Sequence, residues 1–111
     1  QDTRDVVEIL RRYIRGHLHE ELGRNELAQL VYLNPHYLSH IFRKRVGVPL
    51  VDFITAERMK KARELLLSTD LPIRDVALAV GYANISYFSR QFKRAQGQTP
   101  LEFRKSAGKV V

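Results

Sequence analysis

Two short clusters of basic side chains carry the clearest chemical signal in this chain of 111 residues. The first cluster consists of Arg43, Lys44 and Arg45, and the second of Arg90, Lys93 and Arg94. All twelve carboxylates lie outside the windows 27–51 and 76–101 that hold these clusters. A helix face that binds phosphates must exclude carboxylates, whereas a face that is only solvated usually mixes both signs of charge. The two windows therefore predict binding to a polyanion, and we favour DNA.

The composition of the whole chain agrees with a polyanionic partner. A net charge of +7 and an isoelectric point near 10.1 favour such a partner over a small acidic substrate. The chain contains no cysteine, which excludes disulfides, thiolate metal sites and cysteine nucleophiles. No apolar run approaches the ~18 residues of a transmembrane helix. We therefore expect a cytoplasmic protein with no membrane partner.

Metal binding and catalysis are both poorly supported. His36 and His40 lie four residues apart on one helix face, which is metal-ligand spacing, but Tyr37 stands where a zinc hydrolase would need a glutamate. No carboxylate is near enough in the sequence to complete a site. Paired carboxylates, a GxSxG motif and a phosphate-binding glycine loop are also missing. We expect no catalytic residues, no metal site and no cofactor, and hence no enzyme.

The basic clusters lie in an internal repeat, in which residues 27–53 are matched by residues 76–103. Nine positions are identical: Ala28/Ala77, Val31/Val80, Tyr32/Tyr82, Asn34/Asn84, Tyr37/Tyr87, Ser39/Ser89, Phe42/Phe92, Gly47/Gly97 and Phe53/Phe103. The offset is 49 up to Val31 and 50 from Tyr32 onward. This alignment places the extra residue of the second copy at Gly81. Two copies are too few for a solenoid and suggest one small domain that contains the same structural motif twice.

Each copy predicts a short helix, a tight turn and a longer helix. Asn34 is a suitable N-cap, Pro35 fits the first helical position, and Gly47 is a suitable stop. In the second copy, Asn84 is the suitable N-cap and Gly97 is the suitable stop. A short helix followed by a longer one with a polar outer face is the helix-turn-helix arrangement.

Further helices connect and flank the two copies. An N-terminal helix capped by Asp2 or Thr3 has an apolar face made of Val6, Leu10, Ile14 and Leu18. A long helix over residues 50–68 has its apolar face on Val51, Ile54, Ala62 and Leu65. It would be roughly 28 Å long, a sensible rigid spacer for recognition helices one DNA turn apart. In the last short helix, Leu101 and Phe103 are expected to cover the core.

The sequence closely resembles one known family. The most specific stretches are RMKKARELL from Arg58 and the run over 80–103, and the similarity spans roughly residues 22–105. The chain resembles the AraC/XylS DNA-binding domain of bacterial transcription regulators. The resemblance implies an all-α fold with seven helices, in which a long linker helix joins two helix-turn-helix subdomains. The resemblance implies that residues 1–111 form one domain. Its first helix-turn-helix would span about 25–46 and its linker helix about 50–68. The second helix-turn-helix would span about 73–96 and the C-terminal helix about 100–105.

The resemblance also implies which residues meet DNA as both recognition helices enter successive major grooves. Base edges would be read by His36, Ser39 and His40 in the first helix and by Ile85, Ser86, Ser89 and Arg90 in the second. The guanidinium of Arg90 can donate two hydrogen bonds to guanine, one to O6 and one to N7. Arg43, Lys44, Lys93 and Arg94 suit phosphate contacts, which position the protein without reading sequence. Tyr37 and Tyr87 could bond phosphates as well, and partial burial is an equal alternative for them.

Three departures from the family pattern affect these expectations. Arg24 and Pro72 stand where a Ser or Thr usually caps the first helix of each motif, and Ile85 stands where Pro is common. The first recognition helix offers histidines instead of an arginine. We therefore expect weaker base reading there, or reading that sharpens below pH 7 as imidazoles gain charge.

The partners implied by the resemblance are double-stranded promoter DNA, RNA polymerase and a missing N-terminal sensing or receiver domain. The 111 residues alone are expected to be monomeric and to bind one asymmetric half-site. The alternative function is a helical protein-interaction or dimerisation module. That alternative predicts an exposed apolar patch and weak salt dependence of binding, whereas DNA binding predicts the reverse.

Overall fold

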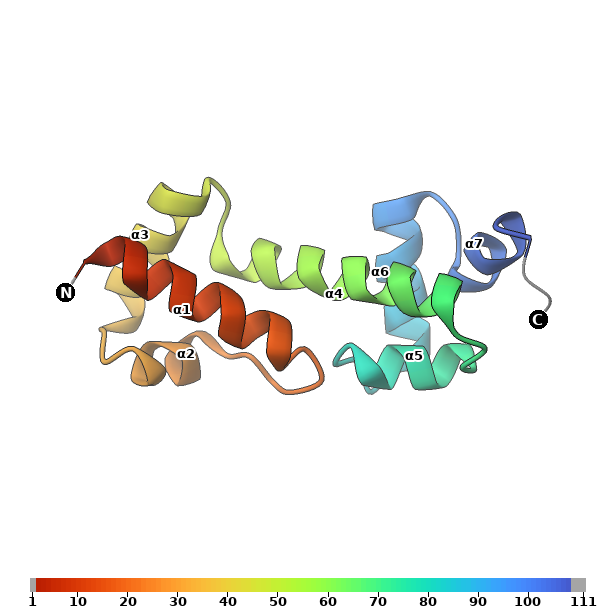
Figure 1. Cartoon of the computed structure of the whole chain (residues 1–111), viewed down its shortest axis with the longest axis horizontal. Helices are drawn as coiled ribbons and strands as arrows, with labels where there is room; N and C mark the ends of the chain where they lie inside the picture. Colours follow the sequence, from red (N-terminus) through yellow and green to blue (C-terminus); the bar gives the residue numbers. More distant parts are fainter. Residues whose placement is uncertain (1, 109–111) are drawn as a thin grey trace. The chain divides into compact units, whose positions relative to one another are not determined.

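The computed structural model describes residues 2–108, which form seven α-helices and contain no strand (Figure 1). The helices are α1 (Thr3–Gly16), α2 (Arg24–Leu30), α3 (Pro35–Val46), α4 (Leu50–Ser68), α5 (Ile73–Ala79), α6 (Ile85–Gln96) and α7 (Pro100–Ser106). The chain divides into two compact units, Gln1–Glu57 and Arg58–Val111. Unit 1 contains α1, α2, α3 and the first part of α4, and unit 2 contains the rest. The predicted all-α fold of seven helices is confirmed.

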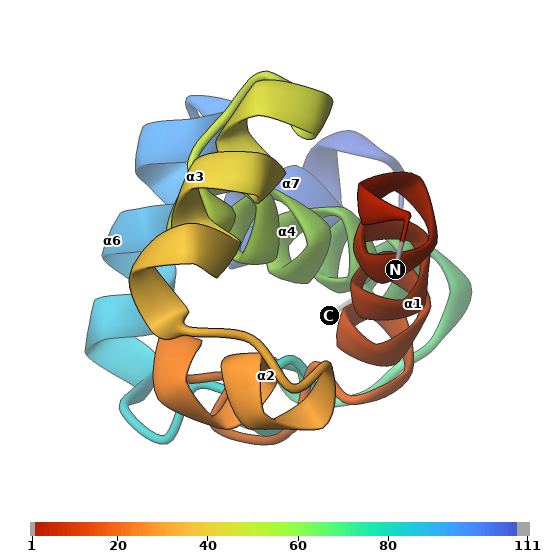
Figure 2. The ribbon, with the colours of Figure 1, turned by 90° about the vertical axis from the view of Figure 1, so that its left-hand side faces the viewer.

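Unit 1 is built around a core to which all of its helices contribute. Helix α3 packs against both α1 and α2, and Figure 2 views these three helices around the start of α4. Leu10 and Ile14 of α1 and Phe42 of α3 are fully buried in this one core. The ring of Phe42 meets the ring of Phe53 edge to face, with centroids 5.3 Å apart. Such pairs stabilise a core beyond the area that they bury.

The core of unit 2 places two aromatic rings on its longer helix, because Phe88 stands where unit 1 has Leu38. Phe88 and Phe92 of α6 are fully buried, with ring centroids 5.9 Å apart. The ring of Phe103 lies 5.4 Å from that of Phe92 and brings α7 onto α6. Equivalent positions on the buried faces of α3 and α6 are therefore not all filled by the same type of side chain.

The predicted ends of both recognition helices are confirmed. The side chain of Asn34 accepts hydrogen bonds from the backbone N–H groups of His36 and Tyr37. Asn84 accepts one from Tyr87 in the same way. Gly47 and Gly97 end the two helices with φ of +94° and +81°, values that glycine tolerates best.

The turns correct the alignment of the repeat. Tyr32 and Gly81 each follow the C-cap residue of the shorter helix, Val31 and Val80, with φ of +57° and +95°. The next residues also agree, because the N–H groups of Leu33 and Tyr82 donate to equivalent carbonyls, at 2.9 and 2.8 Å. Tyr32 therefore matches Gly81 and not Tyr82, and the extra residue of the second copy is Ala83. The identity of Tyr32 with Tyr82 suggested the wrong register.

The predicted apolar face of α4 is partly wrong. Val51 is 67% exposed, whereas its neighbour Leu50 is buried together with Ile54 one turn later. The helix begins at Leu50, and Pro49 precedes it. Because the two ends of α4 serve different cores, no single stripe runs along it, and a pattern fitted to the whole helix misplaced its first turn.

The predicted face of α7 is also partly wrong. Leu101 is exposed and Phe103 is half-buried, while Pro100 and Arg104 are buried. Arg104 is only 4% exposed because its guanidinium lies over the end of α4. A charged residue inside the unit could not be anticipated from an apolar pattern.

The helices α2 and α5 begin without a side-chain cap, but the residue at the cap position of α2 is Gly23 and not, as the resemblance implied, Arg24. Gly23 precedes α2 and Arg24 is its first residue, whereas Pro72 precedes α5. Neither Gly23 nor Pro72 has a side-chain oxygen that could accept a hydrogen bond from the first turn. By contrast, the side chain of Asp2 caps α1 by accepting from the N–H of Arg4.

Candidate nucleic-acid interface

The outward side of α3 carries a continuous polar and basic strip. Leu38 and Phe42 point into the core of unit 1, while His36, His40 and Arg43 are exposed. These three side chains are three or four residues apart, so they are neighbours on one helix face. The structure therefore brings two predicted base readers together with a predicted phosphate contact.

One edge of this strip adjoins the N-terminus of α1. Tyr37 and Lys44 are exposed there and, with His40, line a surface hollow of about 400 Å³. Arg45 also lines the hollow, but its guanidinium donates to the Thr3 hydroxyl at 2.8 and 3.1 Å. That hydrogen bonding ties α1 to the last turn of α3, which makes Arg45 partly structural. Tyr37 and Lys44 stay accessible to a ligand.

Helix α6 presents a matching strip in unit 2. Ser86, Arg90 and Lys93 are exposed at the same spacing, opposite the buried Phe88. The guanidinium of Arg90 lies 5.9 Å from the centroid of the Tyr87 ring. A cation over a ring face gains electrostatic attraction. This contact gives Arg90 a preferred orientation on the surface.

The support beneath Tyr87 is structural. Its ring centroid lies 5.9 Å from that of Tyr82, which is half-buried and also contacts the ring of Phe88. Burial raises the pKa of the Tyr82 hydroxyl, and the guanidinium of Arg58, 5.7 Å from its ring centroid, acts in the opposite direction. Tyr82 therefore stays neutral at physiological pH and packs as part of unit 2.

The remaining residues that were predicted to contact DNA lie at the ends or edges of the two strips. Ile85 opens α6 and is exposed, so an apolar contact is available to it. Ser39 and Ser89 occupy equivalent positions and are half-buried at the edge of each strip. Arg94 is exposed next to Lys93. Of the seven predicted base readers, the two serines at the edges are thus the least accessible.

Arg43 and Lys93, which are predicted phosphate contacts, also lie close to the predicted base readers on their helices. Arg43 follows His36 by seven residues and His40 by three, and Lys93 bears the same relation to Ser86 and Arg90. That spacing puts both cations near the middle of their strips. The same spacing can be read directly from the sequence.

The basic side chains of both strips are electrostatically available. Within residues 2–108, no ion pair involves Arg43, Lys44, Arg90, Lys93 or Arg94. The ion pairs of the described chain lie elsewhere, for example between Arg15 and Glu57. Lys93 contributes to lowering the pKa of the Glu102 carboxyl in α7 without forming an ion pair with it. Exposed cations on helices that carry no carboxylate create the positive potential that attracts phosphates.

Other kinds of site find little support in the described part of the chain. No group of three or more His, Cys, Asp or Glu side chains there could hold a metal ion. No described helix is long and apolar enough to cross a membrane. Two exposed recognition helices in two helix-turn-helix units define the class of protein.

Comparisons with known proteins agree with this class. The family described as "Helix-turn-helix domain" matches residues 27–106. The C-terminal domain of AraT, a response regulator from Geobacillus stearothermophilus, has a TM-score of 0.88 and 36% identity, covering 96% of this chain and 87% of that one. The arabinose operon regulatory protein of Escherichia coli is 38% identical over 100 residues, which are 89% of this chain and 34% of that protein.

The chain belongs to the AraC/XylS family of helix-turn-helix transcription regulators, and it is a DNA-binding output domain of that family. It spans less than half the length of the curated relatives that it matches. One of them is the bifunctional transcriptional activator/DNA repair enzyme AdaA of Bacillus subtilis, 35% identical over 99 residues, which are 89% of this chain and 47% of that protein. Most of these relatives are transcription regulators, so the shared domain is the regulatory one.

Proposed function

We propose that the domain reads specific double-stranded DNA sequences by placing α3 and α6 in major grooves. One observation carries the proposal. Each helix has an exposed strip of polar and basic side chains, without carboxylates and without internal ion pairs. A major groove is wide enough for an α-helix and presents a distinct donor and acceptor pattern for each base pair.

Base reading is divided unequally between the two helices. Arg90 is proposed as the principal reader, because a guanidinium can bond two acceptors of guanine and its stacking on Tyr87 limits its freedom. Ser86 and Ile85 would add a hydrogen bond and an apolar contact on the same side, with Ser89 at the edge. His36 and His40 would read bases from α3, with Ser39 at its edge.

Phosphate contacts flank the readers and fix the register. Tyr37 and Lys44 lie on one edge of the α3 strip, and Tyr87 and Arg94 hold the equivalent positions of α6. We add that Arg43 and Lys93, proposed as phosphate contacts, lie close enough to the middle of their strips to reach a base edge. Contacts to phosphate contribute affinity and salt dependence, and contacts to bases contribute specificity.

The domain is further proposed to work as the non-catalytic output part of a longer cytoplasmic regulator. The short share of each relative that it covers supports a companion sensing or receiver domain, and AraT is itself described as a response regulator. RNA polymerase is the expected protein partner at a promoter. The chain alone is proposed to be a monomer on one asymmetric half-site, and sedimentation equilibrium without DNA tests this, since a dimer would contradict it.

Fluorescence anisotropy on a random-sequence duplex across a salt series tests DNA binding by the two strips. Because bound cations release counterions, log affinity should fall steeply with log salt, and Lys93→Gln or Arg94→Gln should each reduce the slope by about one. Lys60→Gln is the matched control, because Lys60 is exposed on α4 outside both windows. A flat salt dependence would instead favour the helical protein-interaction module.

A further inference from the structure

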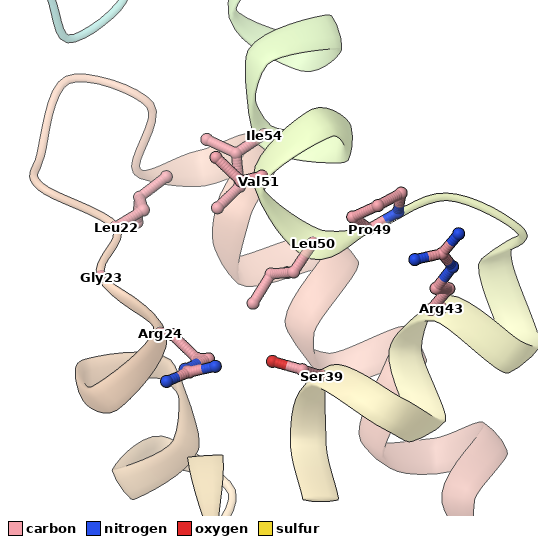
Figure 3. A pocket seen from close by; sticks show the side chains of 9 residues that line it. All are labelled: Leu22, Gly23, Arg24, Ser39, Arg43, Pro49, Leu50, Val51 and Ile54. Carbon is pink, nitrogen blue, oxygen red and sulfur yellow. The ribbon is translucent and has the colours of Figure 1, made fainter. Parts of the chain in front are cut away.

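Unit 1 contains a groove of about 460 Å³ between the loop before α2, one edge of α3 and the start of α4 (Figure 3). Its volume lies within the range of sites for small molecules, roughly 300–1,000 Å³. The groove is separate from the hollow beside Tyr37, which lies on the other edge of α3.

One part of the groove is apolar. The buried side chains of Leu50 and Ile54 line it, and Leu22 and Val51 flank them (Figure 3). Val51 keeps 67% of its surface exposed, although it belongs to the first turn of α4. An apolar group bound here would remove that surface from water, which is favourable.

The other part of the groove is cationic. Figure 3 shows the guanidinium of Arg24 and the hydroxyl of Ser39 pointing toward each other, with Arg43 on the same helix as Ser39. Neither arginine makes an ion pair or side-chain hydrogen bond within residues 2–108. The carboxylate of Glu26 lies against Gly23 but does not line the groove. A planar guanidinium suits a carboxylate, which it can bind through two parallel hydrogen bonds.

The equivalent place in unit 2 is built differently. Ile54 corresponds to Arg104, whose Nη1 donates to the carbonyl of Leu71 at 2.6 Å. Leu71 corresponds to Leu22, so in unit 2 a side chain ties the loop before the short helix to the last helix. Ile54 cannot form such a bond. The side chains that line the groove of unit 1 therefore differ from those at the equivalent place in unit 2.

We propose that this groove binds a small carboxylate with an apolar body, and that the bound molecule competes with DNA. Competition follows because Ser39 and Arg43 line the groove and are also proposed DNA contacts, so this second part rests on the proposed function. Reciprocal linkage then requires DNA to weaken binding of the carboxylate by the same factor.

Binding is tested without DNA by titrating the ¹⁵N-labelled chain with sodium 4-phenylbutyrate and recording amide shifts. The Gly23 amide should shift and saturate, while the Gly97 amide in unit 2 stays unchanged. 4-Phenylbutanol, which has the same apolar body without the charge, should shift Gly23 much less. Arg24→Gln and Val51→Asp change exposed side chains and should each abolish saturation. An equal response to the alcohol, or saturation that survives both substitutions, would overturn the proposal.

Competition is tested by anisotropy with DNA at matched ionic strength, using sodium chloride as the control salt. Saturating 4-phenylbutyrate should raise the dissociation constant for DNA about fivefold or more in the parent chain, and the effect should vanish in Arg24→Gln. Saturation of Gly23 with unchanged DNA affinity would refute competition. Failure of the parent chain to bind DNA at all would instead refute the proposed function and leave the amide titration standing.

Discussion

The two recognition helices share one design but expose different side chains at equivalent positions. Helix α3 exposes His36 and His40 in its strip, and α6 exposes Ser86 and Arg90 at the equivalent positions. Arg90 has five hydrogen-bond donors and an aromatic ring beneath it, whereas a neutral imidazole has one donor and one acceptor. Under the proposed function, the two halves of this repeated scaffold provide similar affinity, while most of the sequence specificity comes from α6.

The two units also differ in how their ends are held. In unit 2, Arg104 bonds the end of α4, and a Thr99–Glu102 capping box opens α7. In unit 1, Ile54 stands in place of Arg104, and Tyr32 holds a left-handed conformation that costs free energy. Unit 1 has polar contacts in other places, such as Arg45 with Thr3 and Arg15 with Glu57, so the two units differ in where these contacts lie.

The largest expected effect comes from removing the buried arginine of unit 2. Arg104 donates to the carbonyls of Leu66, Leu71 and Thr69 at 3.1, 2.6 and 3.3 Å. Arg104→Ala should lower the free energy of unfolding by about 3 kcal/mol, because one buried and two partly buried hydrogen bonds from a charged donor are lost. Urea denaturation measures this, and the exposed neighbour variant Lys105→Ala should change little. Equal stability of the two variants would contradict the role of Arg104.

The next effect concerns specificity. Arg90→Ala should weaken binding on the order of 1–3 kcal/mol at a single base pair and relax the preference there. Competition anisotropy with duplexes substituted at each position measures the change. His40→Ala, at the equivalent place in α3, is the matched variant and should relax preference less. If Arg90→Ala left every position equally selective, Arg90 would not be a base reader.

A smaller effect is expected at the turns. Tyr32 is 94% exposed with φ of +57°, so Tyr32→Gly should relieve strain and stabilise the chain by about 1 kcal/mol. The reciprocal variant Gly81→Ala should destabilise by a similar or larger amount, since Gly81 has φ of +95°. Thermal unfolding of both proteins tests the corrected register. A destabilised Tyr32→Gly protein would show that the tyrosine makes a contact worth more than the strain.

The smallest effect is a pH dependence in α7. The backbone N–H of Thr99 donates to the Glu102 carboxylate at 2.9 Å and is the main reason that the pKa of Glu102 lies below its ordinary value of 4.5. A lowered pKa in the folded state means that the charged form adds stability above pH 4.5, which is lost as pH falls through the folded-state pKa. Glu102→Gln should therefore be slightly less stable than the parent near pH 7, and the difference should shrink toward pH 3. A difference independent of pH would rule out this cause.

Local signals explain which parts of the fold could be predicted from sequence. Asn34, Asn84, Gly47 and Gly97 act on the backbone next to them, so the ends of the recognition helices followed directly. The spacing of buried residues likewise predicted which faces of α3 and α6 are exposed. The roles of individual residues at DNA remain predictions.

The features that sequence reasoning missed depend on distant contacts or on strain. Tyr32 is a poor residue for a left-handed turn, so its type pointed to the wrong partner in the repeat. Arg104 is buried because three carbonyls converge on it from α4 and the loop that follows. The groove beside Val51 depends on which side of α4 packs in unit 1, and no short stretch of sequence encodes that.

Selection of binding sites from a random duplex library tests the central claim most directly. The parent chain should select two contacted segments about ten base pairs apart, one strongly specified and one weakly specified. Arg90→Ala should remove information from the strong segment alone, which assigns that segment to α6. Two equally specified segments that both survive Arg90→Ala would contradict the division of labour between the two recognition helices.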